Sequence, residues 1–418
     1  MATIKQYAFL LILTIFLIKE PFELYLLAGG LYKLFYAVVF IFALSLYNKL
    51  PWHYITIEIK LYYSLFIFIF LLVAFRDPVK FINNIQFLIS ILTFFALYIL
   101  VIKIKNELFI LNILNKLAIV LAVFSLITIF ILYFNINIFP IIIFYPVNAK
   151  DGFEFLFPFS FLHNGLGEGL KNYRSYSYFS EPAKFSYFIV PFIFYNYTLF
   201  KDTKKVKYAI YSLSITVALF TTLSIAGIGA ALFLVFLYAY LFSSKKNIKG
   251  LIFYIIVILF LLLAYQIIED KGGSILERRL MAIISRWNEW SIFIDTMVKR
   301  PFGYGIGHTS QVMYVWSPLL DTYVTYASSV TNVLLLIQSF GILFLIPLII
   351  FILLNIKIIR DLYLYKNNII ARLLIIQIIS GLIFSVSLNL IFSPISLLYL
   401  VISIYFIKNI KQKRGVKV

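Results

Sequence analysis

The sequence contains no cysteine and has only three histidines among its 418 residues. Disulfide bonds and thiolate metal sites are therefore excluded. The histidines are scattered and no carboxylate cluster accompanies them at the spacing of metal ligands, so we predict no metal site. Charge is also scarce: charged residues make up 13% of the chain, against about a quarter in soluble domains, and hydrophobic residues make up 63%. This composition excludes an ordinary soluble protein.

Long apolar runs take the place of the missing charge. Many reach the roughly 20 residues needed to cross about 30 Å of hydrocarbon. The runs and the polar breaks between them predict an all-α polytopic integral membrane protein, with residues 1–418 forming a single transmembrane domain. We expect about 12 transmembrane helices, at approximately 6–18, 24–47, 59–75, 84–102, 110–134, 182–200, 208–223, 225–242, 251–268, 330–356, 373–388 and 391–407.

The basic residues orient these spans. Lys and Arg outnumber Asp and Glu in the connections on one side of the predicted membrane and nearly balance them on the other. By the positive-inside rule, the basic side is cytoplasmic, and both termini are then cytoplasmic. The formal net charge of +19 thus fits a chain that contacts anionic membrane lipids, and no nucleic acid is needed to explain it.

Two connections on the outer side are long, at residues 135–181 and 269–329. The first contains His163 and ends in the stretch NYRSYSYFSEP, which holds Arg174 and Glu181. Glu181 suits the first turn of a helix that Ser180 caps, and Arg174 suits an interfacial anchor. The alternative is functional: the two residues form an acid–cation pair at the outer mouth of the helix bundle.

The second long connection predicts an amphipathic helix on the outer surface, because apolar residues recur at helical spacing. They are Leu276, Leu280, Ile283, Trp287, Trp290, Ile294 and Met297. Arg279 and Arg286 are seven residues apart and share one side of this helix. Guanidinium groups bind phosphate bidentately, so this pair suits a lipid-linked phosphate or diphosphate. Contact with ordinary lipid headgroups is the alternative.

The segment RPFGYGIG at 300–307 follows the amphipathic helix. Its loop glycines, Gly303, Gly305 and Gly307, permit tight turns and a close approach of the backbone. The segment is not a dinucleotide fingerprint, because no strand precedes it. His308 comes next and is a candidate base or hydrogen-bond donor, although a lone histidine in a polar loop is more often incidental.

Four motifs together resemble bacterial O-antigen and capsule repeat-unit polymerases (Wzy-type), within the O-antigen ligase/polymerase superfamily. The first motif, R-x-x-S-x-F-x-E-P-x-x-F, runs from Arg174 to Phe185. The second is TTLSIAGIGAAL at 221–232, and the third combines R-W-x-x-W with RPFGYGIG at 286–307. The fourth is QSFGILFLIPL at 338–348. The spans and the two enlarged outer loops follow the pattern of that family over the whole chain.

The resemblance implies a metal-independent membrane glycosyltransferase, similar to those of the C type, in the bacterial cytoplasmic (inner) membrane. The donor would be a glycan on undecaprenyl diphosphate, and the acceptor a second lipid-linked repeat unit at the outer, periplasmic face. No cofactor is implied, and a membrane protein that regulates chain length is an implied partner. The expected diphosphate-binding residues are Arg174, Arg279 and Arg286, with Arg278 and Arg300 behind them, and Glu181 or His308 would accept the acceptor's proton.

Two alternatives stay open. An O-antigen ligase would transfer the glycan to lipid A–core. Sequences of the ligase branch, however, look to carry a histidine just before the tenth span. This chain reads YASSVTNVLLL there, with Ser328 and Ser329 and no histidine. A lipid-linked oligosaccharide flippase would line a central cavity with ionisable groups, whereas polar residues here gather in two outer loops.

Overall fold

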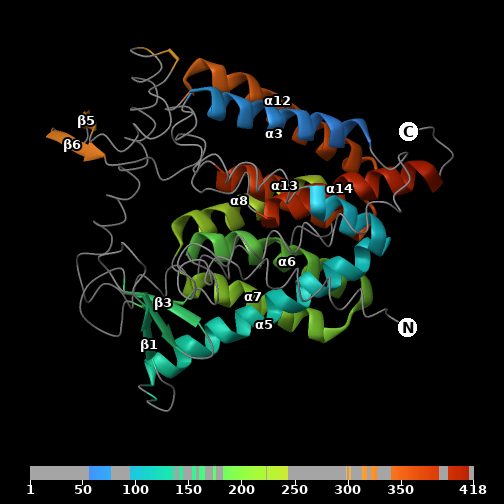
Figure 1. The fold of residues 1–418 in the computed structure, drawn as a ribbon. Helices are drawn as coiled ribbons and strands as arrows, with labels where there is room; N and C mark the ends of the chain where they lie inside the picture. The colour runs from blue at the N-terminus through green and yellow to red at the C-terminus, as the bar shows by residue number, and fades with distance from the viewer. Residues whose placement is uncertain are drawn as a thin grey trace.

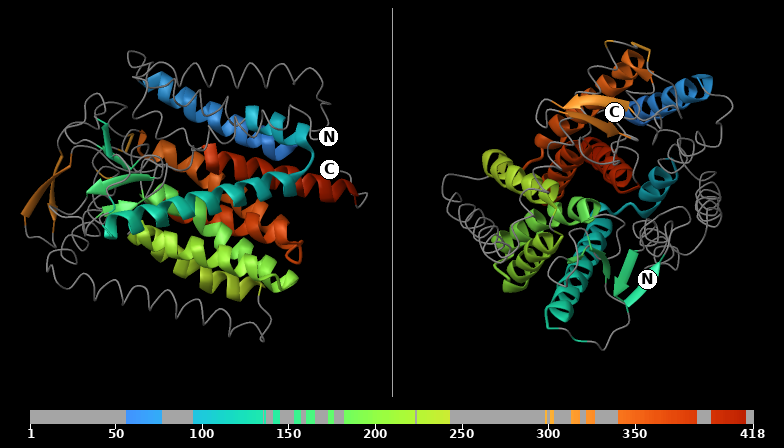
Figure 2. Two further views of the ribbon diagram at one scale, coloured as in Figure 1. Left: turned by 90° about the horizontal axis from the view of Figure 1, so that it is seen from below. Right: turned by 90° about the vertical axis from the view of Figure 1, so that its left-hand side faces the viewer.

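The computed structural model describes residues 56–76, 95–134, 136, 141–144, 153–156, 160–164, 173–175, 182–222, 224–242, 298, 301–302, 313–317, 322–326, 340–385 and 394–413. Long helices run side by side and form a bundle, and short strands lie at one of its ends (Figures 1 and 2). This end is called the strand-bearing end below. The predicted spans 6–18, 24–47 and 251–268 lie outside the described residues.

Each described helix overlaps one of the predicted spans. Their bounds are α3 Ile57–Arg76, α5 Glu107–Tyr133, α6 Pro182–Thr203, α7 Val206–Thr221, α8 Ile225–Phe242, α12 Ile342–Tyr363, α13 Ile369–Ser385 and α14 Pro394–Lys413, with a further helical stretch at Phe95–Ile104. Within the described ranges, three helices are long and apolar enough to cross a membrane: Glu107–Tyr133, Ile342–Tyr363 and Ile395–Lys413. The helical membrane character is therefore supported, and the number of twelve spans stays a prediction.

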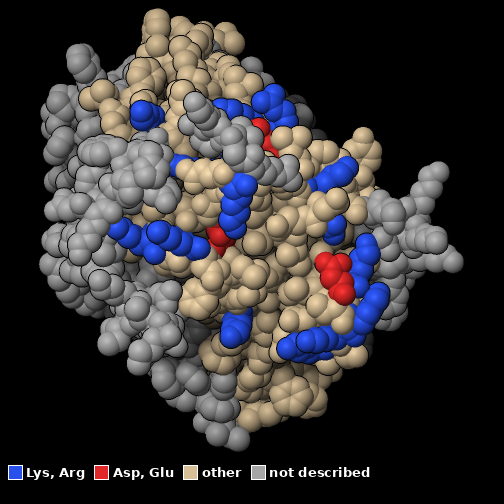
Figure 3. Space-filling view, turned by 90° about the vertical axis from the view of Figure 1, so that its right-hand side faces the viewer, with Lys and Arg blue, Asp and Glu red and all other residues tan. Residues whose placement is uncertain are grey.

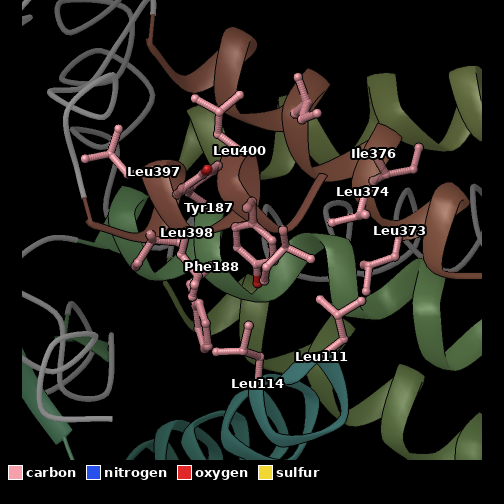
Figure 4. Packing of buried hydrophobic residues seen from close by; sticks show 14 of the residues in the cluster. Leu111, Leu114, Tyr187, Phe188, Leu373, Leu374, Ile376, Leu397, Leu398 and Leu400 are labelled. Carbon is pink, nitrogen blue, oxygen red and sulfur yellow. The ribbon is translucent and has the colours of Figure 1, made fainter. Parts of the chain in front are cut away.

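Helix α6 forms the centre of the core. It packs against α5, α7, α8 and α13, and all its residues from Phe185 to Asn196 are buried. A helix that is apolar around its whole circumference is stable only when other helices surround it. Figure 4 shows labelled side chains of α5, α6, α13 and α14, among them Tyr187 and Leu398, meeting between the helices.

The two outer loops contain short strands, which the sequence analysis did not predict, beside a bundle that is helical as expected. In the first loop, β1 Ile141–Phe144, β2 Phe153–Leu156, β3 Ser160–Asn164 and β4 Tyr173–Ser175 form an antiparallel sheet in sequential order. In the second loop, β5 Met313–Ser317 pairs with β6 Thr322–Tyr326. These segments are rich in aromatic and β-branched residues, which favour strands, but they are too short for a clear periodicity.

The first sheet is attached to the end of α5. Leu156 of β2 and Leu162 of β3 are buried together with Ile131 and Leu132 of α5. This contact fixes the sheet, and with it Arg174 on β4, above the strand-bearing end of the bundle.

Basic side chains gather at the end opposite the strands. Figure 3 looks onto this end and shows many Lys and Arg side chains with few Asp and Glu among them. The helix connections at 201–207 and 357–372, which we predict to be cytoplasmic, lie there (Figure 1). The structure thus separates the two predicted sets of connections by the length of the bundle.

Candidate active site

Of the residues singled out in the sequence, Arg174 is the one whose backbone the structure describes. The other candidates lie outside the described residues, as does the predicted amphipathic helix: Glu181, Arg278, Arg279, Arg286, Arg300, Gly303, Gly305, Gly307 and His308. The site is therefore built here from Arg174 and from the described parts of the four motifs.

Arg174 lies directly opposite His163 in the first sheet. The antiparallel register of β3 and β4 pairs His163 with Arg174 and Leu162 with Ser175. Leu162 is buried against α5, and successive residues of a strand alternate between the two faces of a sheet. Because directly paired residues of neighbouring strands lie on the same face of a sheet, positions 163 and 174 share one face. The sequence placed His163 in the same loop but did not predict this pairing.

The first motif continues into α6, which begins at Pro182 as predicted. Four residues on, the hydroxyl of Ser186 donates a hydrogen bond to the carbonyl oxygen of Pro182 (2.9 Å). The same hydroxyl lies 3.2 Å from the hydroxyl of Thr222, which belongs to the second motif. The first turns of α6 are thus connected to the turn between α7 and α8.

The second motif forms this turn through its own side chains. The Thr222 hydroxyl donates to the carbonyl of Leu219 (2.6 Å) and accepts from the backbone N–H of Ser224 (3.2 Å). The Ser224 hydroxyl then accepts from the backbone N–H of Gly227 (3.1 Å), which caps the start of α8. These bonds explain why the chain reverses around Ser224 within so few residues.

Gly227 allows α8 to lie close against α6. A Cβ atom added at Gly227 would stand 2.5 Å from the Cβ of Ser186, and closer still to its Oγ. Since real Cβ atoms do not approach so closely, only glycine permits this contact between the second motif and Ser186, the residue directly after the first motif.

The third and fourth motifs also meet. The backbone N–H of Ile342, at the start of α12, donates to the carbonyl oxygen of Pro301 in RPFGYGIG (2.8 Å). Gly341, the glycine of the fourth motif, precedes it with φ +58° and ψ −135°. Residues other than glycine rarely adopt this backbone conformation, so Gly341 has a defined role in turning the chain into α12.

The arrangement supplies groups suited to an anionic substrate. Arg174 carries a permanent positive charge, and its neighbour His163 can donate a hydrogen bond or exchange a proton. Within the described ranges, no three His, Asp or Glu residues gather where they would hold a metal ion.

Comparisons of the chain with models of known protein families, with curated proteins and with solved structures find no match. The proposals that follow therefore rest on the motifs, their geometry and the physical chemistry of the residues.

Proposed function

We propose that the chain is a surface-polysaccharide polymerase of the bacterial cytoplasmic membrane. It transfers a glycan from undecaprenyl diphosphate to a hydroxyl of a second lipid-linked repeat unit at the outer face. One observation carries the proposal: the motifs meet in pairs. Ser186, which directly follows the first motif and donates to its Pro182, contacts the second motif, and the third motif contacts the fourth. Motifs that are far apart in the sequence but meet in the fold are expected when their residues serve one site.

The first pair is joined by side chains. Ser186 follows Glu181 by little more than one helical turn, and it contacts both Thr222 and the position of Gly227. The start of α6 is held in place by the second motif. Glu181 precedes α6 in the sequence, and a catalytic carboxylate requires firm support from its surroundings.

The second pair is joined through the backbone. The bond from Ile342 to Pro301 fixes the beginning of RPFGYGIG against the start of α12. Arg300 precedes Pro301 in the sequence and is one of the arginines that we propose to bind the diphosphate.

The chemistry proceeds as a displacement at the anomeric carbon. The acceptor hydroxyl attacks this carbon, the new C–O bond forms, and the bond from the carbon to the diphosphate oxygen breaks. Glu181 or His308 takes the proton of the hydroxyl, and the diphosphate leaves with the electron pair. Arg174, Arg279 and Arg286 stabilise the negative charge that develops on the diphosphate.

The charge distribution supports the orientation. If the basic end of the bundle faces the cytoplasm, its lysines and arginines contact the anionic inner leaflet. The strand-bearing end, with Arg174, then faces outward, where lipid-linked repeat units are presented to polymerases of the resembled type. A chain-length regulator in the same membrane remains a proposed partner.

Arginine substitutions in cells test the proposal. In a bacterium that depends on this chain for its polymer, Arg174→Ala and Arg286→Ala should each reduce polymer formation by about 100-fold or more, the effect expected when one charge-stabilising donor is lost. The variants should still insert into the membrane at normal levels. Arg372→Ala is the matched control, because Arg372 is the last residue of the 357–372 connection at the opposite end and donates to the carbonyl of Lys366. Full polymer in both test variants would contradict the diphosphate-binding role.

A further inference from the structure

A cavity lies between α6, α12, α13 and α14, with polar and apolar residues in its lining. It is lined by Tyr187, Phe351, Asn355, Gln377, Ile378, Gly381, Leu382, Ser385, Ser396, Leu397, Tyr399 and Leu400. Ser385 ends α13 and Ser396 lies in the first turn of α14, so both serines lie toward the strand-bearing end. Tyr187 lies about 7.5 Å along α6 from Pro182, at 1.5 Å per residue. The cavity therefore lies near the start of α6, toward the strand-bearing end of the bundle.

Buried polar atoms point to a missing partner in this cavity. Both amide atoms of Gln377 and the hydroxyl of Tyr399 are buried and make no hydrogen bond with any described residue. Gln377 lies near the hydroxyl of Tyr187, but in a geometry too poor for a hydrogen bond, and Tyr187 is 3.1 Å from the hydroxyl of Ser396. Because buried polar groups are nearly always hydrogen-bonded, these atoms require water or a ligand.

The size and charge of the cavity restrict what it can hold. The volume open to the centre of a water-sized group is about 30 Å³. A single water molecule requires roughly 10–15 Å³ on the same measure. None of the lining residues is Asp, Glu, Lys, Arg or His. A diphosphate or a metal ion buried there would have no counter-charge, which is costly. The occupant is therefore small, uncharged and able both to donate and to accept hydrogen bonds.

We propose that the cavity binds one edge of a sugar ring and takes two of its hydroxyl-bearing groups in place of water. The amide of Gln377 both donates and accepts, the hydroxyl of Tyr399 does the same, and the ring of Phe351 supplies an apolar surface for the C–H groups. This inference rests on the proposed function and adds to it: the arginines hold the diphosphate at the mouth, and the cavity selects the sugar beneath it.

Binding of free sugars tests the cavity without requiring polymer formation. The purified protein in lipid nanodiscs is mixed with glucose, galactose or N-acetylglucosamine, and saturation transfer from protein to sugar is measured by NMR. We expect transfer to at least one sugar, falling at least fivefold in Gln377→Leu and in Tyr399→Phe. Tyr195→Phe is the matched control, because Tyr195 of α6 is a buried tyrosine like Tyr399 of α14 but donates to Asn112, outside the cavity.

Three results would overturn the proposal: no transfer to any of the sugars, transfer that both cavity variants retain, or equal transfer to glycerol, which would show a hydration site only. Thermal unfolding of each variant checks that it is folded. Sugar binding that depends on Gln377 in a protein that makes no polymer would keep this inference and reject the polymerase. Polymer formation without such binding would reject this inference alone.

Discussion

Replacing Gly227 by alanine tests whether the first two motifs meet as described. The added methyl group would stand 2.5 Å from the Cβ of Ser186 and closer still to its Oγ. A change of the Ser186 rotamer moves the Oγ but not the Cβ, which is fixed to the backbone. One of the two helices must therefore move away from the other to make room for the methyl group.

The size of the effect follows from two opposing contributions. Overpacking a close contact costs about 1 to 3 kcal/mol, whereas glycine to alanine in a helix gains about 1 kcal/mol in intrinsic propensity. The net loss for Gly227→Ala is then between zero and about 2 kcal/mol. Gly229→Ala is the control on the same helix, because an added Cβ there meets nothing within 4 Å. It keeps the gain without the cost, so the two variants should differ by about 1 to 3 kcal/mol.

The assay is equilibrium unfolding of the purified variants in mixed micelles, followed by circular dichroism. Ser186→Gly removes both clashing atoms, so the penalty of Gly227→Ala should shrink in that background, and a double-mutant cycle measures the coupling. Equal stability of Gly227→Ala and Gly229→Ala, or an absence of coupling to Ser186, would refute the described contact between α6 and α8.

Three further predictions concern other contacts. Gly341→Ala should lower the unfolding free energy by about 1 to 3 kcal/mol, because alanine is strained at φ +58°; unchanged stability in the same assay would contradict this conformation. Asn196→Leu leaves Asn115 without its reciprocal hydrogen bonds (2.6 and 3.1 Å) and should cost about 1 to 3 kcal/mol, whereas adding Asn115→Leu should recover most of the loss, and a double variant no more stable than the single one would contradict this. Glu58→Gln, which removes the partly exposed ion pair with Lys357 (2.9 Å), should cost less than about 1 kcal/mol. Burial raises the pKa of Glu58, which precedes the predicted span 59–75, but the hydrogen bond and charge of Lys357, together with hydrogen bonds from the backbone and Thr56, outweigh it and hold the pKa below the usual value of a glutamate. The contribution is therefore present above pH 4.5 and lost as the pH falls through the lowered pKa, and a difference between wild type and Glu58→Gln that persisted in stronger acid would contradict this sign.

The sequence predicts the helices well because an apolar run is a local property. The start of α6 at Pro182, after Ser180 and Glu181, and the turn around Ser224 are both where the sequence placed them. The end of α12 differs from the prediction. The helix continues to Tyr363, past the predicted end at 356, because the segment KIIRDLY adds further helical turns after the apolar run stops.

The strands and the contacts between motifs are not local properties. The pairing of His163 with Arg174 depends on a register that short strands of five and three residues do not reveal. Nor does the sequence show that Gly227 faces Ser186, or that Gly341 has a positive φ, since a glycine serves many purposes. The residues of the second and fourth motifs were identifiable, but their neighbours depend on how the helices pack.

Reconstitution of the purified protein in lipid, with undecaprenyl-diphosphate-linked repeat units as sole substrate, tests the central claim most directly. Products are separated by size, and no metal or nucleotide is added. The account predicts a ladder of lipid-linked multimers. The absence of a ladder would contradict it: transfer that begins only when lipid A–core is added would show a ligase, and substrate that crosses the bilayer unchanged would show a flippase.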